Sequence, residues 1–423
     1  MKVLFISASP LKNEISIGNT FINLFGDMED VEMASVCTRT GAPDPKVSRC
    51  FCITEKMIIN NLVKKTPVGV EININRDNDV AQINEKSINF AKKYRFTAFF
   101  WLQNLVWKLG NWKSKELENF IKDFDPDIIF TVHSNLVYLN NLILHIKKIT
   151  GKKLVVYAWD NNYSLKRFML SPLRWIKHFL DRASMRKVIK KADLFYVISD
   201  VQKNDYQKAF KKECKVLTKS ADFTKEPYLK AEYNSPLQLV YTGNIGLNRW
   251  KSLEHIANVL EKINENGVKS QLRIYTGNTV TDKIDKALNK GHSSFVMGSV
   301  SADKVKEIQN DADMLVHIEP LDLKNKLYVR QSFSTKIVDY LAAARPILAF
   351  GPKDVASIDH FVKNNCAIVA DNEDELHGKL CEVIHDEHKL NKLSLSAFEC
   401  GRRSHNKNDI DKMLKEDFEH LLN

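Results

Sequence analysis

Hydrophobic and polar positions in the second half of the chain switch regularly between two periods. Short apolar runs predict strands at residues 237–242, 271–276, 294–297, 314–318, 346–350 and 366–369. Between these runs, apolar residues recur at helical spacing and predict helices at about 252–265, 281–290, 301–311, 335–344, 355–364 and 373–387. This alternation of strands and helices is typical of an α/β fold built on a doubly wound parallel sheet.

The first half shows the same pattern less regularly. Apolar runs predict strands at 2–8, 127–132, 154–158, 194–198 and 215–217, while residues 31–80 give no clear pattern. Polar residues follow two of these strands, with His133 directly after the second and Asp160 close to the end of the third. Doubly wound sheets bind ligands at the carboxyl ends of their strands. We therefore expect His133 and Asp160 either at a ligand site or as side chains that cap loops.

Length and a break in periodicity predict two domains. A chain of 423 residues is too long for one typical domain and suits two of roughly 200 residues each. The periodicity disappears between Ser220 and Pro236, in a polar stretch. We expect a first domain at residues 1–225, a second at 226–405, and a C-terminal helix at 406–423 that packs back on the first domain.

The net charge of +11 arises from two stretches of the first half. Residues 90–115 carry six basic side chains and no acidic ones, and residues 164–191 carry nine basic and one acidic. Aromatic residues lie among these charges, as is typical of helices in the headgroup region of an anionic membrane. The alternative for the first stretch is an ordinary core helix whose aromatic residues pack inward. The residues expected to face the membrane are Trp101, Trp107, Arg174, Trp175, Lys177 and Arg182.

Other features of the composition narrow the location and the partners. No uninterrupted apolar stretch reaches about 18 residues, so we expect no transmembrane helix. The seven cysteines are scattered, and the only close pair, Cys50 and Cys52, has no partner pair at zinc spacing. No recognised nucleic-acid-binding module accompanies the basic stretches, so nucleic acid is not an expected partner. We expect a protein of the reducing cytoplasm, held peripherally at the cytoplasmic face of the plasma or inner membrane, with no metal site.

A short polar loop before the predicted helix at 335–344 is the first candidate binding site. Ser334 and Thr335 are typical of a helix N-cap, where unpaired N–H groups and the positive end of the helix dipole attract anions. Lys336 adds a full positive charge, and Asp339, about one turn further on, offers a carboxylate to hydroxyl groups. Together they predict a site for a phosphate beside sugar hydroxyls. The alternative is an ordinary capped helix.

A glycine-containing turn after the strand at 237–242 is the second candidate. Its two glycines allow the backbone to approach a ligand closely, and two cations follow them. These residues, with one carboxylate directly after the strand at 314–318, are Gly243, Asn244, Gly246, Arg249, Lys251 and Glu319. We expect the turn and its cations to bind a diphosphate, and Glu319 to contact a sugar or a base. The alternative is a tight turn with surface cations.

The second half resembles the donor domain of GT-B glycosyltransferases, closest to the retaining family-4 group. The family's glycine turn followed by a lysine matches Gly243 and Lys251, although Asn244 stands where the family usually has arginine. The family's two glutamates, eight residues apart, fall on Gln331 and Asp339. The sequence around these positions is similar to a subgroup that builds bacterial surface polysaccharides. The resemblance is weaker over the first half.

This resemblance implies a GT-B fold, in which two Rossmann-like domains face each other across a cleft. It implies a glycosyltransferase that moves a sugar, with retention, from a nucleotide-diphosphate-sugar to a glycan or lipid-linked acceptor, with UDP-sugar as the favoured donor. Ser334 and Thr335 would hold the diphosphate through the backbone, and Lys251 would stabilise the leaving group. His133 would hydrogen-bond the donor sugar and Asp160 would orient the acceptor hydroxyl. No metal or other cofactor is expected.

Two alternatives to this function stay open. A non-transferring GT-B enzyme, such as a nucleotide-sugar epimerase, would need further acid–base carboxylates in the cleft. A degenerate GT-B subunit would bind a membrane or a partner without turnover. Gln331, in place of a carboxylate, keeps this second alternative open.

Overall fold

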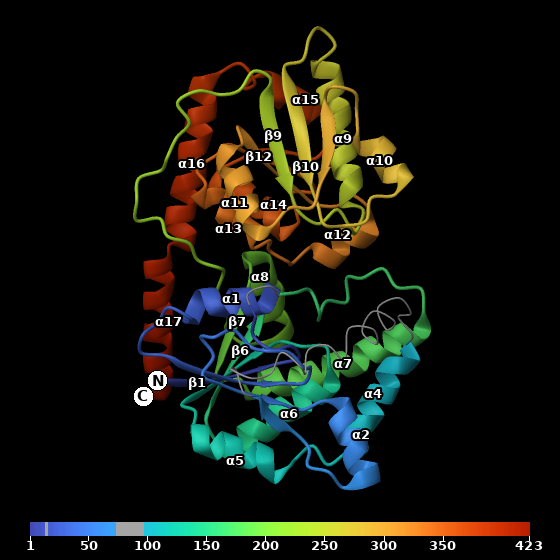
Figure 1. The fold of residues 1–423 in the computed structure, drawn as a ribbon, viewed down its shortest axis with the longest axis vertical. Coiled ribbons are helices and arrows are strands. Elements are labelled where there is room, and N and C mark those ends of the chain that lie inside the picture. The colour runs from blue at the N-terminus through green and yellow to red at the C-terminus, as the bar shows by residue number, and fades with distance from the viewer. Residues whose placement is uncertain (13–15, 73–96) are drawn as a thin grey trace.

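Two α/β domains are stacked along the long axis of the molecule in the computed structural model, which describes residues 1–12, 16–72 and 97–423 (Figure 1). Each domain is built on its own sheet. The predicted fold class, two doubly wound Rossmann-like domains, is confirmed. The predicted membrane-facing stretch begins at residue 90, so its first seven residues lie outside the described part of the chain.

The first sheet has eight strands in the order β4-β3-β2-β1-β5-β6-β7-β8. Neighbouring strands are parallel except β3 and β4, which are antiparallel. Alternate residues of β1 enter opposite cores, with Val3 and Phe5 in one and Leu4 and Ile6 in the other, so both faces of the sheet are covered. The strands are β1 (Lys2–Ser7), β2 (Glu32–Cys37), β3 (Arg49–Cys52), β4 (Val70–Ile72), β5 (Ile128–Val132), β6 (Lys153–Ala158), β7 (Leu194–Val197) and β8 (Lys215–Val216).

The helices of the first domain surround this sheet, and α5 shows how an apolar face is buried against it. In α5 the buried residues recur at helical spacing and are Leu117, Phe120, Ile121 and Phe124. The side chain of Ser114 accepts a hydrogen bond from Leu117 N and so fixes where this helix begins. The helices are α1 (Ser16–Phe25), α2 (Glu55–Lys64), α4 (Thr97–Leu109), α5 (Lys115–Phe124), α6 (Val137–Thr150), α7 (Pro172–Lys191) and α8 (Asp200–Phe210).

The second sheet has six parallel strands in the order β11-β10-β9-β12-β13-β14. The chain moves outward from β9 to β11, returns to the other side of β9, and continues from β12 to β14. The gap between β9 and β12 is therefore the switch point at which doubly wound sheets bind ligands. The strands are β9 (Leu237–Thr242), β10 (Ser270–Tyr275), β11 (Ser294–Gly298), β12 (Met314–Ile318), β13 (Ile347–Phe350) and β14 (Ile368–Ala370).

These strands lie within two residues of the bounds predicted from the apolar runs. The helix predicted at 373–387 is shorter in the structure, where α15 ends at Cys381, and the short helix α12 and the long helix α16 were not predicted. The helices are α9 (Arg249–Ile263), α10 (Asp282–Leu288), α11 (Ala302–Asp311), α12 (Leu323–Val329), α13 (Lys336–Ala342), α14 (Ala356–Asn364), α15 (Glu373–Cys381), α16 (Glu387–His405) and α17 (Lys407–Leu422).

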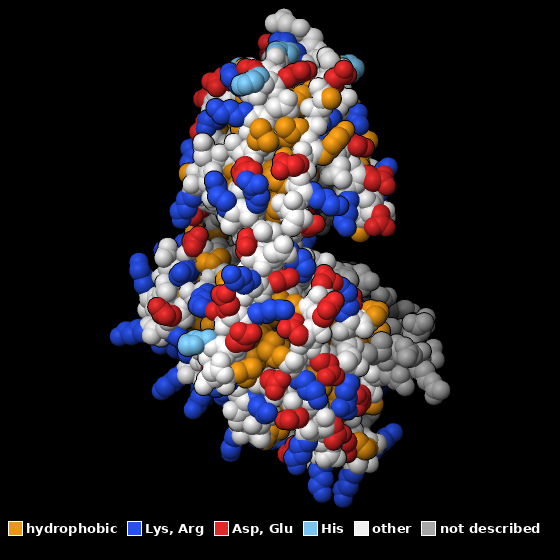
Figure 2. Space-filling view, turned by 90° about the vertical axis from the view of Figure 1, so that its left-hand side faces the viewer, with side chains coloured by type: hydrophobic (Ala, Val, Ile, Leu, Met, Phe, Trp, Pro, Cys, Tyr) orange, Lys and Arg blue, Asp and Glu red, His pale blue; other side chains and the backbone are white. Residues whose placement is uncertain are grey.

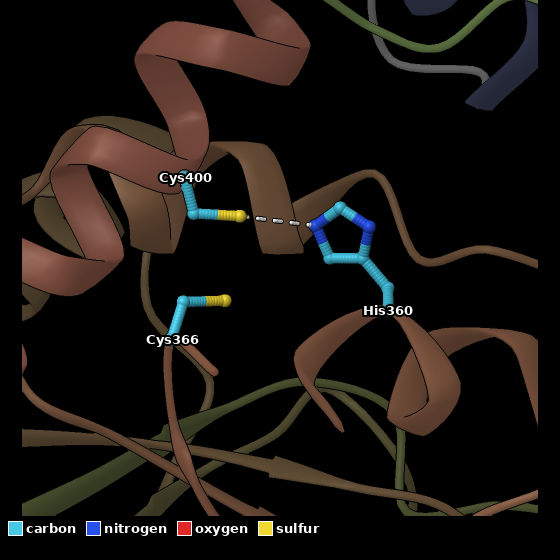
Figure 3. Close-up of side chains that lie close together, drawn as sticks. All are labelled: His360, Cys366 and Cys400. Atoms are coloured by element: carbon cyan, nitrogen blue, oxygen red, sulfur yellow. Dashed lines mark hydrogen bonds between the residues drawn. The ribbon is translucent and has the colours of Figure 1, made fainter. Parts of the chain in front are cut away.

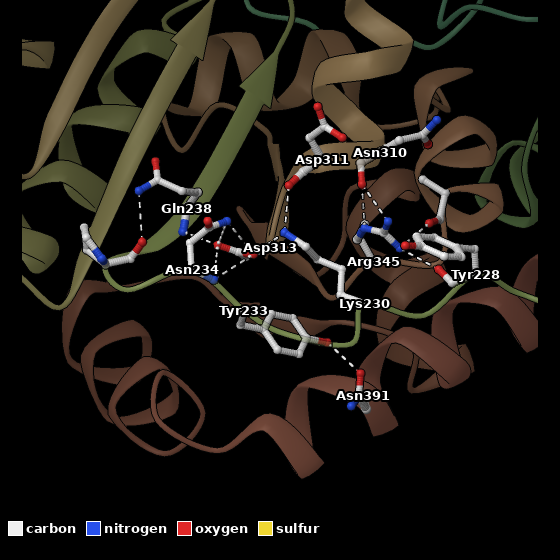
Figure 4. Close-up of polar contacts among 12 residues, drawn as sticks. Tyr228, Lys230, Tyr233, Asn234, Gln238, Asn310, Asp311, Asp313, Arg345 and Asn391 are labelled. Atoms are coloured by element: carbon white, nitrogen blue, oxygen red, sulfur yellow. Dashed lines mark hydrogen bonds and ion pairs between the residues drawn. The ribbon is translucent and has the colours of Figure 1, made fainter.

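The polar segment between the two sheets is fastened to the second domain by buried charges (Figure 4). Asp313, which is fully buried, accepts hydrogen bonds from Lys230, Asn234 and the backbone N–H of Gln238. The guanidinium group of Arg345 donates to four backbone carbonyls, two of them in Asn310 and Tyr228. The loss of periodicity in this segment therefore marks a chain held by polar contacts rather than by an apolar face.

The C-terminal helix α17 lies along the first domain, and the two ends of the chain lie close together (Figure 1). Its Phe418 stacks on Phe25 of α1, with 5.9 Å between ring centroids. Tyr196 of β7 donates a hydrogen bond of 2.6 Å to Asp417. The described helices include none that combines the length and the apolar character needed to cross a membrane.

Candidate functional site

A cleft separates the two domains, and the space-filling view shows the notch between the two lobes on one side (Figure 2). The cleft contains a cavity of about 280 Å³ lined by both domains. The wall from the first domain includes Trp159 and Asp160, which follow β6. The opposite wall comes from the ends of β9 and β12 and from the loop before α13. This is the switch point of the second sheet, so the cavity lies where the strand order predicts a ligand site.

Two cations of the second domain line this cavity. Arg249 is the first residue of α9, and Lys336 is the first residue of α13. Lys336 Nζ donates a 2.9 Å hydrogen bond to the carbonyl oxygen of Thr242. Burial lowers the pKa of Lys336, and the charge of Arg249 lowers it further. Two cations held this close in a partly dehydrated cavity favour the binding of an anion between them.

Gly243 is needed for this arrangement, but for a different reason than expected. A Cβ atom at this position would lie 2.8 Å from Lys336 Nζ and 2.7 Å from the hydroxyl oxygen of Tyr241. The glycine therefore makes room for the lysine rather than for the backbone to meet a ligand. In the same turn, Asn244 Oδ1 accepts a hydrogen bond from Gly246 N at 2.6 Å, which fixes the shape of the turn.

Glu319 is a buried carboxylate on the wall of the cavity. Its side chain is 3% exposed, and its Oε2 lies 2.8 Å from Arg249 Nη2. Its Oε1 lies 3.5 Å from His317 Nε2. Burial raises the pKa of Glu319, but the close approach of His317 and the charge of Arg249 outweigh burial and lower the pKa overall. The carboxylate is thus ionised at neutral pH and holds Arg249 in the cavity.

Asp160 is the carboxylate that the first domain presents to the second. Its Oδ1 accepts a 3.1 Å hydrogen bond from Ser332 Oγ, across the cleft. Its own carbonyl oxygen accepts a hydrogen bond from Gln202 Nε2 at 3.0 Å, which fixes the loop after β6. Burial raises the pKa of Asp160. A carboxylate with a raised pKa at a cleft is suited to accept a proton or a hydrogen bond from a hydroxyl group.

His133 does not reach the cavity, so its predicted contact with a donor sugar is wrong in this structure. Its backbone N–H donates to Tyr157 O at 2.7 Å, so the chain still pairs with β6 at this residue. The ring is 2% exposed, and Tyr163, Tyr206 and Phe210 are among the aromatic rings packed around it. Neither ring nitrogen has a hydrogen-bond partner among the described residues. Burial lowers the pKa of His133 to about 3, and the ring stays neutral.

Lys251 also lies away from the cavity. It is exposed on α9, and its Nζ lies 5.7 Å from the ring centroid of Trp250. Arg249, two residues earlier, faces the cavity instead. Of the two cations in the predicted diphosphate site, the structure brings only Arg249 to the cleft.

The two positions of the family's glutamate motif contact the first domain and the linker instead of the cavity. Gln331 is 1% exposed, and its Nε2 donates a hydrogen bond to Asp205 of α8. Arg330 forms an ion pair with the same carboxylate. Asp339 pairs with Lys219 at 2.6 Å and keeps 41% of its side chain exposed. The donor-binding roles of Gln331 and Asp339 stay predictions.

The loop before α13 does line the cavity, through Ser334 and Thr335. The side chain of Thr335 makes no N-cap hydrogen bond, and the Ser334 N–H lies 3.4 Å from Ser357 Oγ. A second cavity of about 370 Å³ continues from here along the ends of β10 and β11, and shares Asn244 and Lys336 with the first. The candidate site is therefore an elongated one that runs along the edge of the second sheet.

Several residues at the cavity were missed by the sequence reasoning, among them Trp159, His317 and Tyr340. Trp159 and His317 lie next to residues that were singled out at strand ends, so the same strand-end signal could have identified them. Tyr340 was assigned to the buried face of its helix. It is buried, and its hydroxyl lies 3.2 Å from Thr242 Oγ1 at the base of the cavity.

The predicted membrane-facing residues separate into two groups. Trp101 and Arg174 are exposed, and Trp175 and Lys177 are partly exposed. Trp107 is only 2% exposed and stacks on Tyr138 with 4.6 Å between ring centroids, so its membrane-facing role is wrong.

Arg182 also turns inward from the predicted membrane face. Its guanidinium group lies 3.8 Å from the ring centroid of Tyr163 and donates a hydrogen bond to the carbonyl oxygen of that residue. This side chain therefore fixes the loop before α7 rather than meeting a surface.

No protein-family model and no curated protein matches the chain by sequence. Solved structures match it along nearly its whole length. Sucrose-phosphate synthase from Thermosynechococcus elongatus is 12% identical with a TM-score of 0.61, and the match covers 99% of this chain and 98% of that one. HepE from Anabaena in complex with UDP is 12% identical with a TM-score of 0.62, over 99% and 100%. The trehalose-6-phosphate synthase OtsA is 9% identical with a TM-score of 0.60, over 99% of both chains. The chain therefore has the GT-B fold of these glycosyltransferases.

Proposed function

We propose that the chain is a glycosyltransferase that moves a sugar from a nucleoside-diphosphate donor to a hydroxyl group of a glycan or lipid-linked acceptor. One observation carries the proposal: Arg249 and Lys336 face Asp160 across a cavity at the switch point of a GT-B fold. The cations are placed for a diphosphate and the carboxylate for a hydroxyl. A UDP-sugar is the favoured donor, supported by a neighbour of the same fold, HepE, whose structure contains UDP-glucose.

The chemistry follows from these placements. When the bond between the sugar and the diphosphate breaks, negative charge develops on the leaving phosphate, and Arg249 and Lys336 stabilise it. Glu319 orients Arg249 and lowers the cost of holding its charge in the cavity. The oxygen of the acceptor hydroxyl forms the new bond to the sugar carbon that loses the diphosphate, and Asp160 accepts the proton of that hydroxyl. These steps use side chains of this chain alone.

A binding screen followed by matched variants tests the donor site. Thermal shift against UDP-, GDP-, ADP- and CMP-sugars identifies the donor, and calorimetry then gives its affinity. Arg249→Ala and Lys336→Ala should each weaken UDP binding by about tenfold to a hundredfold, since a charge-assisted hydrogen bond contributes about 1.5–3 kcal/mol. Lys286→Ala, an exposed lysine on α10, is the matched control and should bind like the wild type. Equal affinity of all four proteins would contradict the proposed site.

Product analysis separates transfer from the alternatives. A new glycosidic product with release of the nucleoside diphosphate supports a transferase, whereas an epimerised sugar would identify a non-transferring enzyme. Donor binding without any turnover would favour a degenerate subunit. The retaining outcome and a role in surface-polysaccharide synthesis are supported only by the family-4 resemblance, and product NMR tests the first of them.

We propose further that the first domain docks on an anionic membrane through α4 and α7, which lie side by side (Figure 1). Large apolar side chains on this face are exposed, namely Trp101, Leu102, Leu105, Leu109, Leu170, Leu173, Ile176, Phe179 and Leu180. Exposed basic residues accompany them, among them Lys108, Arg174 and Lys187. Apolar residues surrounded by cations fit the boundary between headgroups and acyl chains.

Liposome flotation tests this surface. Binding should require anionic lipid and weaken with salt, because the Debye length falls from about 10 Å at 0.1 M to about 3 Å at 1 M. Leu173→Asp should weaken flotation, while Leu395→Asp, an exposed leucine on α16 in the other domain, should not. Flotation that is absent, or equal for the two variants, would remove the membrane proposal.

A further inference from the structure

Three side chains that can bind a metal come together in the second domain, from two separate segments of the sequence. His360 lies on α14, Cys366 lies between α14 and β14, and Cys400 lies on α16. Figure 3 shows the three side chains pointing toward one another. Their ligand atoms all lie within 4.8 Å of one another, and Cys400 Sγ lies 3.5 Å from His360 Nε2. Both cysteines are fully buried.

We propose that these residues bind a thiophilic divalent metal ion, with Zn²⁺ as the first candidate. Zinc prefers thiolate sulfur at about 2.3 Å and imidazole nitrogen at about 2.0 Å in a tetrahedral arrangement. Two such ligands on one ion lie about 3.5 Å apart, which agrees with the 3.5 Å between Cys400 and His360. Thiolate and imidazole select zinc over hard cations such as Mg²⁺ and Ca²⁺. Binding would release the two thiol protons to solvent, so the affinity should rise with pH.

The fourth coordination position would be taken by water, or by His405 at the end of α16 after a shift of its side chain, because the described ligand atoms that lie within 4.8 Å of one another are those of His360, Cys366 and Cys400. His405 is 2% exposed, and its Nε2 has no hydrogen-bond partner among the described residues. Its Nδ1 lies 2.8 Å from Thr218 Oγ1. Its ring centroid lies 5.3 Å from that of His360. A histidine fixed through one nitrogen, with the other left free, is in the state in which histidines commonly ligate metals.

The site also contacts the loop that lines the cleft. Phe333 packs on His360, with 5.1 Å between ring centroids, and on His405, with 5.7 Å. Phe333 lies between Ser332 and Ser334 and lines the same cavity. A metal ion that joins α14 to α16 would therefore hold one wall of the cleft in place. Its role would be to position that wall, without touching the reacting groups.

Metal content and spectroscopy of the full-length protein test the proposal. Protein purified under reducing conditions and loaded with ZnCl₂ should retain about one Zn²⁺ per chain after gel filtration. Co²⁺ in place of Zn²⁺ should give the thiolate-to-metal charge-transfer absorption of a tetrahedral thiolate site. Cys400→Ser and His360→Ala should each lower the affinity for Zn²⁺ at least tenfold and abolish the rise in melting temperature that Zn²⁺ causes in the wild type.

Cys50→Ser is the matched control, because Cys50 is another fully buried cysteine, with Cys37 Sγ 3.9 Å away. This variant should bind Zn²⁺ like the wild type. A tenfold loss in His405→Ala would identify the fourth protein ligand, and an unchanged affinity would identify water in its place. The proposal is overturned if the wild type gives no Co²⁺–thiolate absorption, or if Cys400→Ser retains the metal. It is also overturned if mass spectrometry of the reduced-purified protein finds Cys366 and Cys400 joined as a disulfide.

Discussion

The ion pair between Arg249 and Glu319 gives a quantitative test of how the cleft is built. Glu319→Gln removes the negative charge but keeps an oxygen that accepts hydrogen bonds from Arg249. Removing one partner of a buried ion pair costs about 3–5 kcal/mol, because the remaining charge is left without compensation. Here the Arg249 side chain keeps 20% exposure to the water of the cleft. With that screening and the retained hydrogen bond, we expect the free energy of unfolding to fall by about 1–2 kcal/mol at neutral pH.

The converse variant should cost more. Arg249→Ala removes the charge that compensates the Glu319 carboxylate, which is 3% exposed, and leaves that carboxylate beside His317. We expect a loss of about 3 kcal/mol. In the double variant neither charge is left buried, so its loss should be smaller than the sum of the single losses by about 1–2 kcal/mol. Urea unfolding of the four proteins measures this coupling. Losses that add to within about 0.5 kcal/mol would show that the two groups act independently and would refute the reasoning.

The pH dependence supplies a second check. The pKa of Glu319 in the folded protein is lowered from its usual 4.5. Protons therefore bind more readily to the unfolded chain, and the stabilisation is fully present above pH 4.5 and is lost as the pH falls through the lower, folded value. The difference in stability between the wild type and Glu319→Gln should be constant near neutral pH and shrink in acid. A difference that persists unchanged in acid would contradict the assignment of the charge to Glu319.

Three further predictions concern single side chains. Asp160→Asn should keep UDP affinity but slow transfer by about 10²–10⁴-fold, and it should remove the fall in rate that the wild type shows as the pH drops through the raised pKa of Asp160. In urea unfolding, Trp107→Ala should cost about 3–5 kcal/mol, whereas the exposed Trp101→Ala should change stability by at most about 0.5 kcal/mol; similar losses would contradict the burial of Trp107. His133→Leu removes two unpaired buried nitrogens and should raise the free energy of unfolding by about 1 kcal/mol. The wild type should also lose stability as the pH falls from 6.5 to about 3, because the unfolded histidine then takes up a proton, and the leucine variant should lose less.

The part of the fold that could be predicted is the part that local periodicity determines. The central strands of the second domain, β9, β12 and β13, are fully or largely buried, so in the sequence they are apolar runs between helical stretches. Within residues 31–72, where no pattern was found, β3 and β4 have only four and three residues, whereas β2 and α2 have six and ten and were missed despite their ordinary length. Strands this short contain too few positions to reveal a period.

The sequence predicted which sheet edges carry the candidate site. It did not predict which side chains at those edges face the cleft. Asp160 and His133 both lie near strand ends, but only Asp160 reaches the cleft, because Tyr163 and Tyr206 pack against the ring of His133. Similarly, Arg249 and Lys251 are two residues apart in one helix, and such residues point about 200° apart. Only one of them can face the cavity. Which of these side chains faces the cleft depends on packing between segments that are distant in the sequence, and a single sequence does not show that packing.

The departure from the family pattern at Gln331 has a physical explanation in the structure. The family's first glutamate falls on Gln331, whose Nε2 donates a hydrogen bond to Asp205 of the opposite domain. A glutamate here would place a buried carboxylate against the Asp205 carboxylate, which is 34% exposed. Two carboxylates this close repel each other, so ionising both would cost free energy. Arg330 already pairs with the same carboxylate and neutralises one charge. The Gln331 amide thus donates a hydrogen bond to Asp205, which a carboxylate at this position would repel. This hydrogen bond joins the two domains beside the cleft.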